Sequence, residues 1–475
     1  MSGLIGALDS AAKSLATQSE GVQLAGKNLA NANTPGYARQ RLVIGSLGTV
    51  QTSVGAQSMG TQAVGIQQIR DQFLDAQMTR EIAQTGFLQT QDENLLKAQA
   101  DLGEQIDSTT SSTTISDTGS ATSGISAAIS GFFSAVEDVS ATPSDTGAKQ
   151  VLVEKADLLA NKINVSDSRL ASLQQDISAQ NANDLGTVND ILKQVASLNG
   201  EIQKYELNAP GSAVDLRDER QSKLEELAQY MDFTAREIPD SHGQMEITAK
   251  GADGSDIPLV SKTNVLGGVS ADDAAGTFTG GAPPKQLSLQ GGSLEGNIQV
   301  RDGAIAQLRE NLQAVANQLT DSVNKAYNPD GTGNNFFAAA PATGLIALDP
   351  TLSYTSLQTA SNGDAGGSDL ARAVAAVATR QFSTTGGDHI TGTISGFYTK
   401  AASGFGQSVA SVDSKLTDQL TVQSLIGTQR DSVSGVSQDE ELTDLMKYQR
   451  GYQASARVLT VIDNLLDVVV NGLIK

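Results

Sequence analysis

Apolar side chains recur over residues 4–29 at steps that alternate between three and four. The positions are Leu4, Leu8, Ala11, Leu15, Val22, Ala25 and Leu29, with Gln18 as the one polar residue in the series. This spacing predicts an amphipathic α-helix whose apolar stripe is as narrow as the seam of a coiled coil. The pattern stops at Asn31-Ala32-Asn33-Thr34-Pro35-Gly36-Tyr37. Pro35 presets φ at the second position of a turn and Gly36 accepts a positive φ at the third, so we expect a type II turn.

A second stripe of the same kind closes the chain. Its positions are Leu442, Leu445, Tyr452, Ala456, Leu459, Leu466, Val470 and Leu473, with Gln449 and Asp463 interrupting it. Two amphipathic helices at opposite ends of one chain can pair only if the chain returns to its start. We therefore predict that the chain ends pair as an α-helical coiled coil. Because both stripes are narrow, we expect the terminal helices to be marginally stable alone.

Helical periodicity also dominates the interior. The predicted helices run from Asp71 to about Gln105, from Ile125 to Val139, from Gly147 to Tyr205, from just after Leu216–Arg220 to about Tyr230, from Ile298 to the turn that begins at Asn328, and from near Ser408 into the terminal stripe. Forty helical residues extend about 60 Å, so the pattern at 147–205 indicates a rod-like domain. Residues 107–124 are mostly Ser, Thr, Gly and Asp and predict a polar connector. In the Ala-, Gly- and Thr-rich stretch 336–410 we expect short strands and a helix at Asp369–Arg380.

Two regions favour strands. Val and Ile residues within 41–69 indicate short strands or extended arms, and residues 233–238, 245–248 and 257–260 have strand character. The predicted fold is mainly α with an inserted β domain, as an elongated multidomain rod. We place a terminal coiled-coil domain at 1–70 and 430–475, a helical rod domain at 71–233 and 293–429, and the inserted β domain at 234–292.

Composition narrows the function. The 475 residues include 53 acidic and 32 basic side chains, a net charge of −21, which disfavours an electrostatic grip on nucleic acid or anionic lipid. Cys is absent, which excludes disulfides and thiolate metal sites. The sequence contains no run of about 18 apolar residues, so we expect no membrane-spanning segment. The start Met1-Ser2-Gly3-Leu4 lacks the basic and long apolar regions of a cleaved signal peptide, which alone predicts a cytoplasmic protein.

Several segments partly match motifs of catalytic or ligand-binding sites, but each has a simpler structural explanation. The stretch 21–28 nearly matches a phosphate-binding loop, but Asn28 stands where Ser or Thr belongs and the stretch lies inside the helical stripe. His242 and His389 lie in Gly-rich turns, and residues 328–334 carry one carboxylate where a calcium loop uses several. The acids Asp439-Glu440-Glu441 open a helix, where its dipole favours negative charge. We predict no catalytic, cofactor-binding or metal-binding residues, and no enzyme activity.

Both ends of the chain carry longer motifs. The segment Leu29-Ala30-Asn31-Ala32-Asn33-Thr34-Pro35-Gly36-Tyr37-Ala38-Arg39-Gln40 resembles the amino-terminal motif of bacterial flagellar axial proteins, the rod, hook and hook-associated proteins. Asp439-Glu440-Glu441-Leu442, then Tyr448-Gln449 and residues 452–458, resemble the other end of the same family. The elements Leu216–Arg220, Gly292–Gly296 and Asn324 are similar to those of its hook–filament junction members.

The resemblance implies a structural subunit at the junction between hook and filament, assembled by coupled folding of its terminal helices. It implies self-association in a ring, contacts with hook protein and with the next junction protein, and an export chaperone that covers Leu442 to Leu473 in the cytoplasm. Export would need no cleaved signal peptide and would end in the extracellular flagellum. The candidate assembly residues are Leu4, Leu8, Leu15, Val22, Leu29, Asn33, Pro35, Gly36, Tyr37, Leu442, Leu445, Tyr452, Leu459, Leu466, Val470 and Leu473.

Two alternatives remain open. Another axial subunit such as hook protein would share the terminal motifs, although hook proteins are β-rich between their ends and the run at 147–205 is helical. A secreted wall-acting enzyme would need two positioned carboxylates or a metal site. Neither 234–292 nor 336–410 contains a recognisable one.

Overall fold

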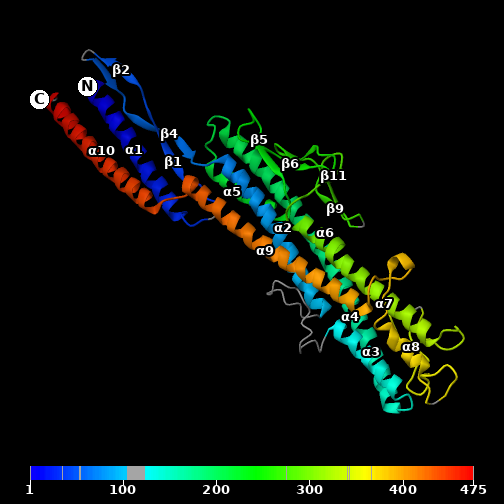
Figure 1. The fold of residues 1–475 in the computed structure, drawn as a ribbon. Helices are drawn as coiled ribbons and strands as arrows, with labels where there is room; N and C mark the ends of the chain where they lie inside the picture. The colour runs from blue at the N-terminus through cyan, green and yellow to red at the C-terminus, as the bar shows by residue number, and fades with distance from the viewer. Residues whose placement is uncertain are drawn as a thin grey trace.

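The two chain ends lie side by side at one tip of an elongated molecule (Figure 1). The computed structural model describes residues 2–34, 36–52, 55–103, 124–273, 275–339, 341, 343–364 and 366–473. The predicted mainly α rod with an inserted β domain and paired chain ends is confirmed. The predicted connector at 107–124 lies outside the described residues except for Gly124.

Most predicted helices are present. The α-helices are α1 (Ser2–Ala30), α2 (Gln72–Leu102), α3 (Ile125–Ala141), α4 (Thr146–Glu206), α5 (Val214–Tyr230), α6 (Ser293–Gln299), α7 (Ala306–Tyr327), α8 (Asp369–Val377), α9 (Ile394–Ser434) and α10 (Gln438–Leu473). A π-helical segment η1 (Val300–Ile305) joins α6 to α7, and a 3-10 turn η2 (Thr384–Gly386) follows α8. The 61 residues of α4 extend about 90 Å, so this helix runs along most of the rod.

A β-hairpin lies along α1 in the terminal layer (Figure 1). Strand β1 (Gln40–Ser46) pairs antiparallel with β4 (Thr61–Gln68), and the tip is β2 (Thr49–Thr52) paired with β3 (Gly55–Ser58). The Ala63 amide donates to Thr17 Oγ1 at 3.2 Å, which fastens β4 to α1. The terminal layer therefore consists of α1, α10 and this hairpin.

The inserted β domain packs against α4 and α5. Its strands are β5 (Thr234–Glu237), β6 (Met245–Lys250), β7 (Asp256–Ser261), β8 (Asn264–Val265), β9 (Ser270–Asp272), β10 (Thr277–Gly280) and β11 (Lys285–Leu287). The first four form one antiparallel sheet in the order β5-β6-β7-β8, and the last three form another in the order β11-β10-β9. His242 lies exposed in the turn between β5 and β6, as the sequence predicts.

The apolar interior of the rod forms two large clusters. We call the one farther from the chain ends the distal core; it includes Phe132, Leu159, Ile163, Leu170, Leu173, Ile177, Leu312, Leu319, Phe336 and Phe337. We call the other the proximal core; it includes Leu185, Val188, Leu192, Val195, Leu227, Ile247, Leu259, Leu294 and Ile298. Helix α4 runs through both.

The last helical prediction was wrong in two respects. The helix expected from near Ser408 begins at Ile394, where the Thr393 side chain accepts a hydrogen bond from the Gly396 amide. Its buried residues Ile394, Tyr398, Ala402, Phe405 and Val409 are separated by many small residues, which hid the stripe. The helix also does not continue into the terminal stripe, because extended backbone at Gly435 ends α9 and α10 starts separately at Gln438.

Gly292 is required where α2, α5 and α6 meet. Its φ is +86°, its amide donates to the Ala83 carbonyl at 2.7 Å, and an added Cβ would lie 2.2 Å from the Tyr230 carbonyl carbon. We expect Gly292→Ala to lower the free energy of unfolding by about 3 kcal/mol in urea titrations. Gly186→Ala is the matched control: Gly186 is in α4 with nothing within 4 Å, so this change should add about 0.5–1 kcal/mol. Equal effects would refute the crowding at Gly292.

Candidate assembly interface

Helices α1 and α10 pack antiparallel, with small and polar residues at several of their close contacts. Ser14 Oγ lies 3.2 Å from Ser455 Oγ, and Gly21 faces the Tyr448 ring so closely that a Cβ would be 2.5 Å from Cδ1. Contacts between side chains of this kind bury little apolar area, so these contacts contribute little hydrophobic stabilisation.

The candidate assembly residues on α1 all lie in partly buried positions: Leu4, Leu8, Leu15, Val22 and Leu29. On α10, Leu445, Leu459 and Leu466 are also partly buried. Leu442, Tyr452 and Val470 are instead 45%, 40% and 48% exposed. Leu473 ends α10, but its side chain lies outside what the structure describes, as does Pro35.

The face of α10 toward α1 therefore differs from the predicted stripe. The less exposed positions along α10 are Glu441, Asp444, Leu445, Tyr448, Gly451, Ser455, Ala456, Leu459, Ile462, Leu466 and Val469. Several of them are polar or small, so hydrophobic spacing did not identify them. The predicted interruptions Gln449 and Asp463 are exposed and do not interrupt the contact.

The turn after α1 has the predicted geometry. The Tyr37 amide donates to the Thr34 carbonyl at 3.2 Å, and Gly36 has a φ of +76°, as position three of a type II turn requires. The Tyr37 hydroxyl donates to Asn28 Oδ1 at 2.8 Å. Burial and the nearby carboxylates Asp218, Asp215 and Glu441 raise the pKa of the Tyr37 phenol, so it stays a donor at neutral pH. Asn33 is exposed beside it.

A buried polar cluster joins the start of α10 to the end of α1. Glu441 is 3% exposed; its Oε1 accepts from Arg39 Nε at 2.7 Å and its Oε2 from Asn28 Nδ2 at 3.0 Å. Arg39 Nη1 also bonds Glu440 Oε2 at 2.6 Å, and the Arg39 amide donates to the Ser434 carbonyl at 2.8 Å. The position of Glu441 at the start of a helix is thus only part of its role, because its carboxylate also accepts hydrogen bonds from Arg39 and Asn28.

The terminal layer is joined to the rod through the first turn of α5. Lys27 Nζ bonds Asp215 Oδ1 at 2.6 Å, and Gln40 Nε2 bonds the same oxygen at 2.9 Å. Beside them, Asp218 accepts from Arg70 and from Gln68. Burial, with a smaller contribution from Asp215, raises the pKa of Asp218 to about 6 against the opposing effect of Arg70.

Arg70 links this turn to two further segments. It donates to Asp75 Oδ2 at 3.1 Å and to the Gly36 carbonyl at 2.9 Å. These bonds connect the turn after α1, the start of α2 and the start of α5. A cavity of about 770 Å³ lies beside them, at the elbow between α9 and α10. Sequence reasoning singled out residues 216–220 only by family resemblance and did not identify Arg70 or Asp215.

The same turn of α5 holds the β domain. Arg217 forms a two-bond pair with Glu206, with Nε and Nη2 each 2.8 Å from a carboxylate oxygen, and also reaches Glu237 on β5 at 3.3 Å. Arg220, which is 4% exposed, donates to Asn199 Oδ1 and to the Gly243 carbonyl. Burial, with Arg217 nearby, lowers the pKa of Arg220 to about 10. Residues 215–220 therefore connect the terminal layer, the rod and the β domain.

The Glu206–Arg217 pair predicts a pH dependence. Burial favours a higher pKa for Glu206, but hydrogen bonds from Arg217 and from the Gly211 and Ala213 amides outweigh it and lower the pKa below its ordinary value. A carboxylate with a lowered folded pKa stabilises the fold above the unfolded value, about 4.5, and loses that effect as the pH falls through the folded value. We expect Glu206→Gln to cost about 2–3 kcal/mol in urea unfolding at pH 7 and progressively less below pH 4.

Glu226→Gln is the control for this measurement. Glu226 is bound to Lys223 and its side chain is 40% exposed, so its loss should cost under about 1 kcal/mol. A loss at Glu206 that is the same at pH 7 and pH 3 would contradict the role of its charge.

A second apolar stripe on α10 faces away from α1. Val458, Val461, Leu465 and Val468 are 50–69% exposed and follow steps of three, four and three. Lys447, Arg450 and Arg457 are exposed on the same helix, while α1 exposes Asp9 and Glu20. The terminal pair thus exposes this second apolar stripe and charges of both signs along its length.

Comparisons with known proteins agree with this architecture. The profile of the flagellar hook-associated protein FlgK helical domain matches residues 112–337, and that of the flagellar basal body rod FlgEFG protein C-terminal region matches residues 428–472. Flagellar hook-associated protein 1 of Bacillus subtilis (strain 168) is 24% identical over 524 residues, covering 98% of each chain. The chain belongs to the bacterial flagellar axial proteins. It is a structural component of the flagellum.

Other relatives within the axial proteins have the same name. Flagellar hook-associated protein 1 of Escherichia coli (strain K12) is 22% identical, covering 94% of this chain and 96% of the relative. That of Salmonella typhimurium is 25% identical over 66% of this chain and 55% of the relative. The flagellar hook junction protein FlgK from Burkholderia pseudomallei superposes with a TM-score of 0.45 at 20% identity, covering 56% of this chain and 47% of that one. Within the described ranges, no helix is long and apolar enough to cross a membrane.

Proposed function

We propose that this axial protein is a subunit of the junction between hook and filament. The observation that carries the proposal is the combination of paired terminal helices, a long helical rod and relatives named flagellar hook-associated protein 1 that match along nearly the whole chain. The mainly helical region between the ends disfavours the alternative of hook protein, for which β-rich structure was expected. A structural role accounts for these features without enzyme activity.

The terminal layer is the proposed assembly surface. The partly buried candidate residues of α1 and α10 hold the two helices against each other, while the candidates Leu442, Tyr452 and Val470 remain exposed for contacts with neighbouring copies in a ring. The second stripe at 458–468 supports a role in contacts between subunits, because neighbouring apolar side chains that are exposed together often mark an interaction site. Hook protein on one side and the next junction protein on the other are the proposed axial neighbours.

Coupled folding is proposed for the free ends of α1 and α10. The polar cluster around Glu441 anchors their bases, whereas among the described residues beyond it only Ile462 of α10 is buried, with 8% of its surface exposed. Neighbouring copies would supply the missing burial. We further propose that an export chaperone covers 442–473 in the cytoplasm, and that the subunit is secreted to the flagellum without a cleaved signal peptide.

We also propose a division of the chain into three parts. The terminal layer would comprise 1–70 and 430–475, the rod 71–233 and 293–429, and the β domain 234–292. Under this division, residues 215–220 of the rod bind the terminal layer through Asp215 and Asp218. They bind the β domain through Arg217.

Deletion of the gene, followed by electron microscopy, tests the junction role. We expect complete hooks without filaments and filament protein shed into the medium. Cells that lack hooks, or that keep normal filaments, would contradict the proposal. Circular dichroism of the purified chain with and without residues 1–20 and 455–475 tests coupled folding: ends that are fully helical in the free subunit would rule it out.

A further inference from the structure

The apolar interior of the rod is interrupted at one level by a layer of amides. Helix α4 contributes Ile177 to the distal core and Leu185 to the proximal core. Between them it buries Asn181, which is 0% exposed, and Asp184. Apolar packing is therefore replaced by polar contacts for about two turns of the longest helix.

Three asparagines from three helices form a chain across the rod at this level. Asn94 Nδ2 on α2 donates to Asn297 Oδ1 on α6 at 2.7 Å, and Asn297 Nδ2 donates to Asn181 Oδ1 on α4 at 2.8 Å. We call these three residues the amide layer. Asn181 Nδ2 is buried without a hydrogen-bond partner among the described residues, so the chain ends in an unused donor.

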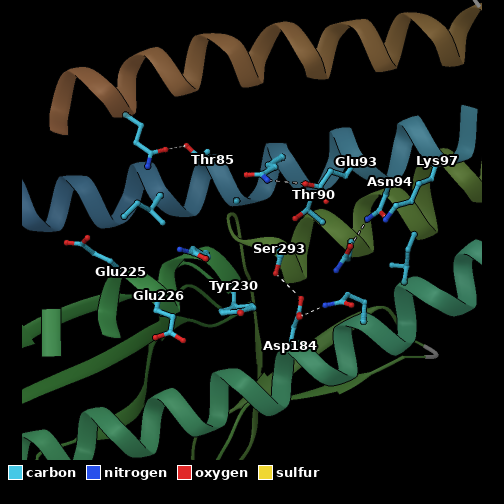
Figure 2. Close-up of a pocket in the computed structure, with 18 of the residues that line it drawn as sticks. Thr85, Thr90, Glu93, Asn94, Lys97, Asp184, Glu225, Glu226, Tyr230 and Ser293 are labelled. Carbon is cyan, nitrogen blue, oxygen red and sulfur yellow. Dashed lines mark hydrogen bonds between the residues drawn. The ribbon is translucent and has the colours of Figure 1, made fainter. Parts of the chain in front are cut away.

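A hollow of about 1,200 Å³ lies beside the amide layer. Asn94 and Asn297 line it together with side chains of α2, α4, α5 and α9, including the carboxylates Glu93, Asp176 and Asp184. Figure 2 shows Ser293 of α6 pointing toward Asp184 of α4, with which it forms a hydrogen bond of 3.0 Å at the edge of this hollow. The helices are thus joined here by side-chain hydrogen bonds around a polar space.

The backbone changes at the same level. The π-helical segment η1 begins at Val300, directly after α6, and the Arg301 carbonyl accepts from Gln174 Nε2 at 2.8 Å. The Arg301 guanidinium reaches Ser178 of α4 and Asp273 of the β domain. Short π-helical segments are uncommon and tend to occur at functional positions. A break in the apolar core, a hollow and an irregular helix therefore coincide.

These features affect stiffness and register differently. Close-packed apolar cores resist deformation, whereas a level with few buried apolar contacts opens at low cost in free energy. The amide chain has one alignment of α2, α4 and α6 in which each oxygen meets its donor, so it restores a single register after each movement.

We propose that the rod flexes at the amide layer, which acts as an elastic joint between two stiff halves. The inference depends on contacts within the rod and would hold whether or not the junction assignment is correct. In an axial structure, such a joint would let the outer half of each subunit change its tilt without disturbing the terminal layer.

Spin-label distance distributions in the full chain test the proposal. The protein has no Cys, so two introduced cysteines would be the only labelling sites. The pair Glu93→Cys and Asp176→Cys spans the hollow between α2 and α4. The control pair is Ala100→Cys on α2 and Arg169→Cys on α4. Both sites are exposed, and each lies seven residues nearer the distal core than the first pair. We expect the first distribution to be at least about twofold broader than the second. Equal widths would overturn the proposal.

Substitutions in the amide layer add a test of cause. Changing Asn94, Asn181 and Asn297 together to Leu removes every partner at once, so no buried polar group is orphaned. This variant should narrow the distribution across the hollow to that of the control pair. Asn297→Ala breaks both amide bonds and should broaden it. If the triple variant does not fold, Asn297→Ala and the unmodified layer still decide the matter. A width that neither variant changes would refute the role of the amide layer.

Discussion

Replacing Arg39 by Met is expected to detach the base of α10 from the terminal layer. Arg39 is the charged partner of Glu441, whose side chain is only 4% exposed, and its loss leaves that carboxylate with Asn28 as its remaining side-chain donor among the described residues. Removing one partner of a buried ion pair typically costs about 3–5 kcal/mol, because the other charge stays out of water. Hydrogen exchange of the full chain should show this loss of protection in the first turns of α10 and in β1.

Two further variants separate the pair from the side chain. Arg39→Met combined with Glu441→Leu removes both charges and should recover most of the lost protection. Lys13→Met breaks the exposed pair with Asp9 and should change protection by less than about 1 kcal/mol. If the double variant is as unprotected as Arg39→Met alone, the buried charge is not what holds the base of α10.

Much of the fold could be predicted because its helices follow their apolar periodicity. The stripes over 125–139 and 147–205 correspond to α3 and α4, and the change of period after residue 233 marks the β domain. Helix α9 was located poorly, since Ala402 and Gly406 are buried where a larger apolar residue would have signalled the stripe. Periodicity finds helices whose buried side chains are large and misses those packed through small ones.

The contacts between distant segments could not be predicted in the same way. Glu441 and Arg39 are 402 positions apart, and Lys27 and Asp215 are 188 apart, so no local pattern pairs them. Charge alone placed Glu441 at a helix start, which is correct, but it gave no information about its partner. The connecting role of residues 215–220 could not be predicted, and these residues were noticed only as a family motif. Their physical role depends on which segments the fold brings next to them.

Charges placed on the second stripe of α10 should strongly weaken assembly while leaving the subunit folded. Val461 and Leu465 are 57% and 50% exposed, so Val461→Asp with Leu465→Asp should barely change thermal unfolding of the free protein. In an assembled contact, each carboxylate would lose its water without a partner. A combined cost of about 3 kcal/mol would weaken addition to isolated hooks about 100-fold.

The control for this variant is Thr460→Asp with Asn464→Asp. These exposed positions precede the stripe by one residue each, so the control adds the same two charges at the same spacing on another side of α10. We expect near-normal filaments for the control and bare hooks for the stripe variant, with both proteins found in the culture medium. Secretion of the stripe variant separates failed assembly from failed export. Normal filaments from that variant would show that the second stripe has no role between subunits, and self-association would then depend on other surfaces of the terminal layer.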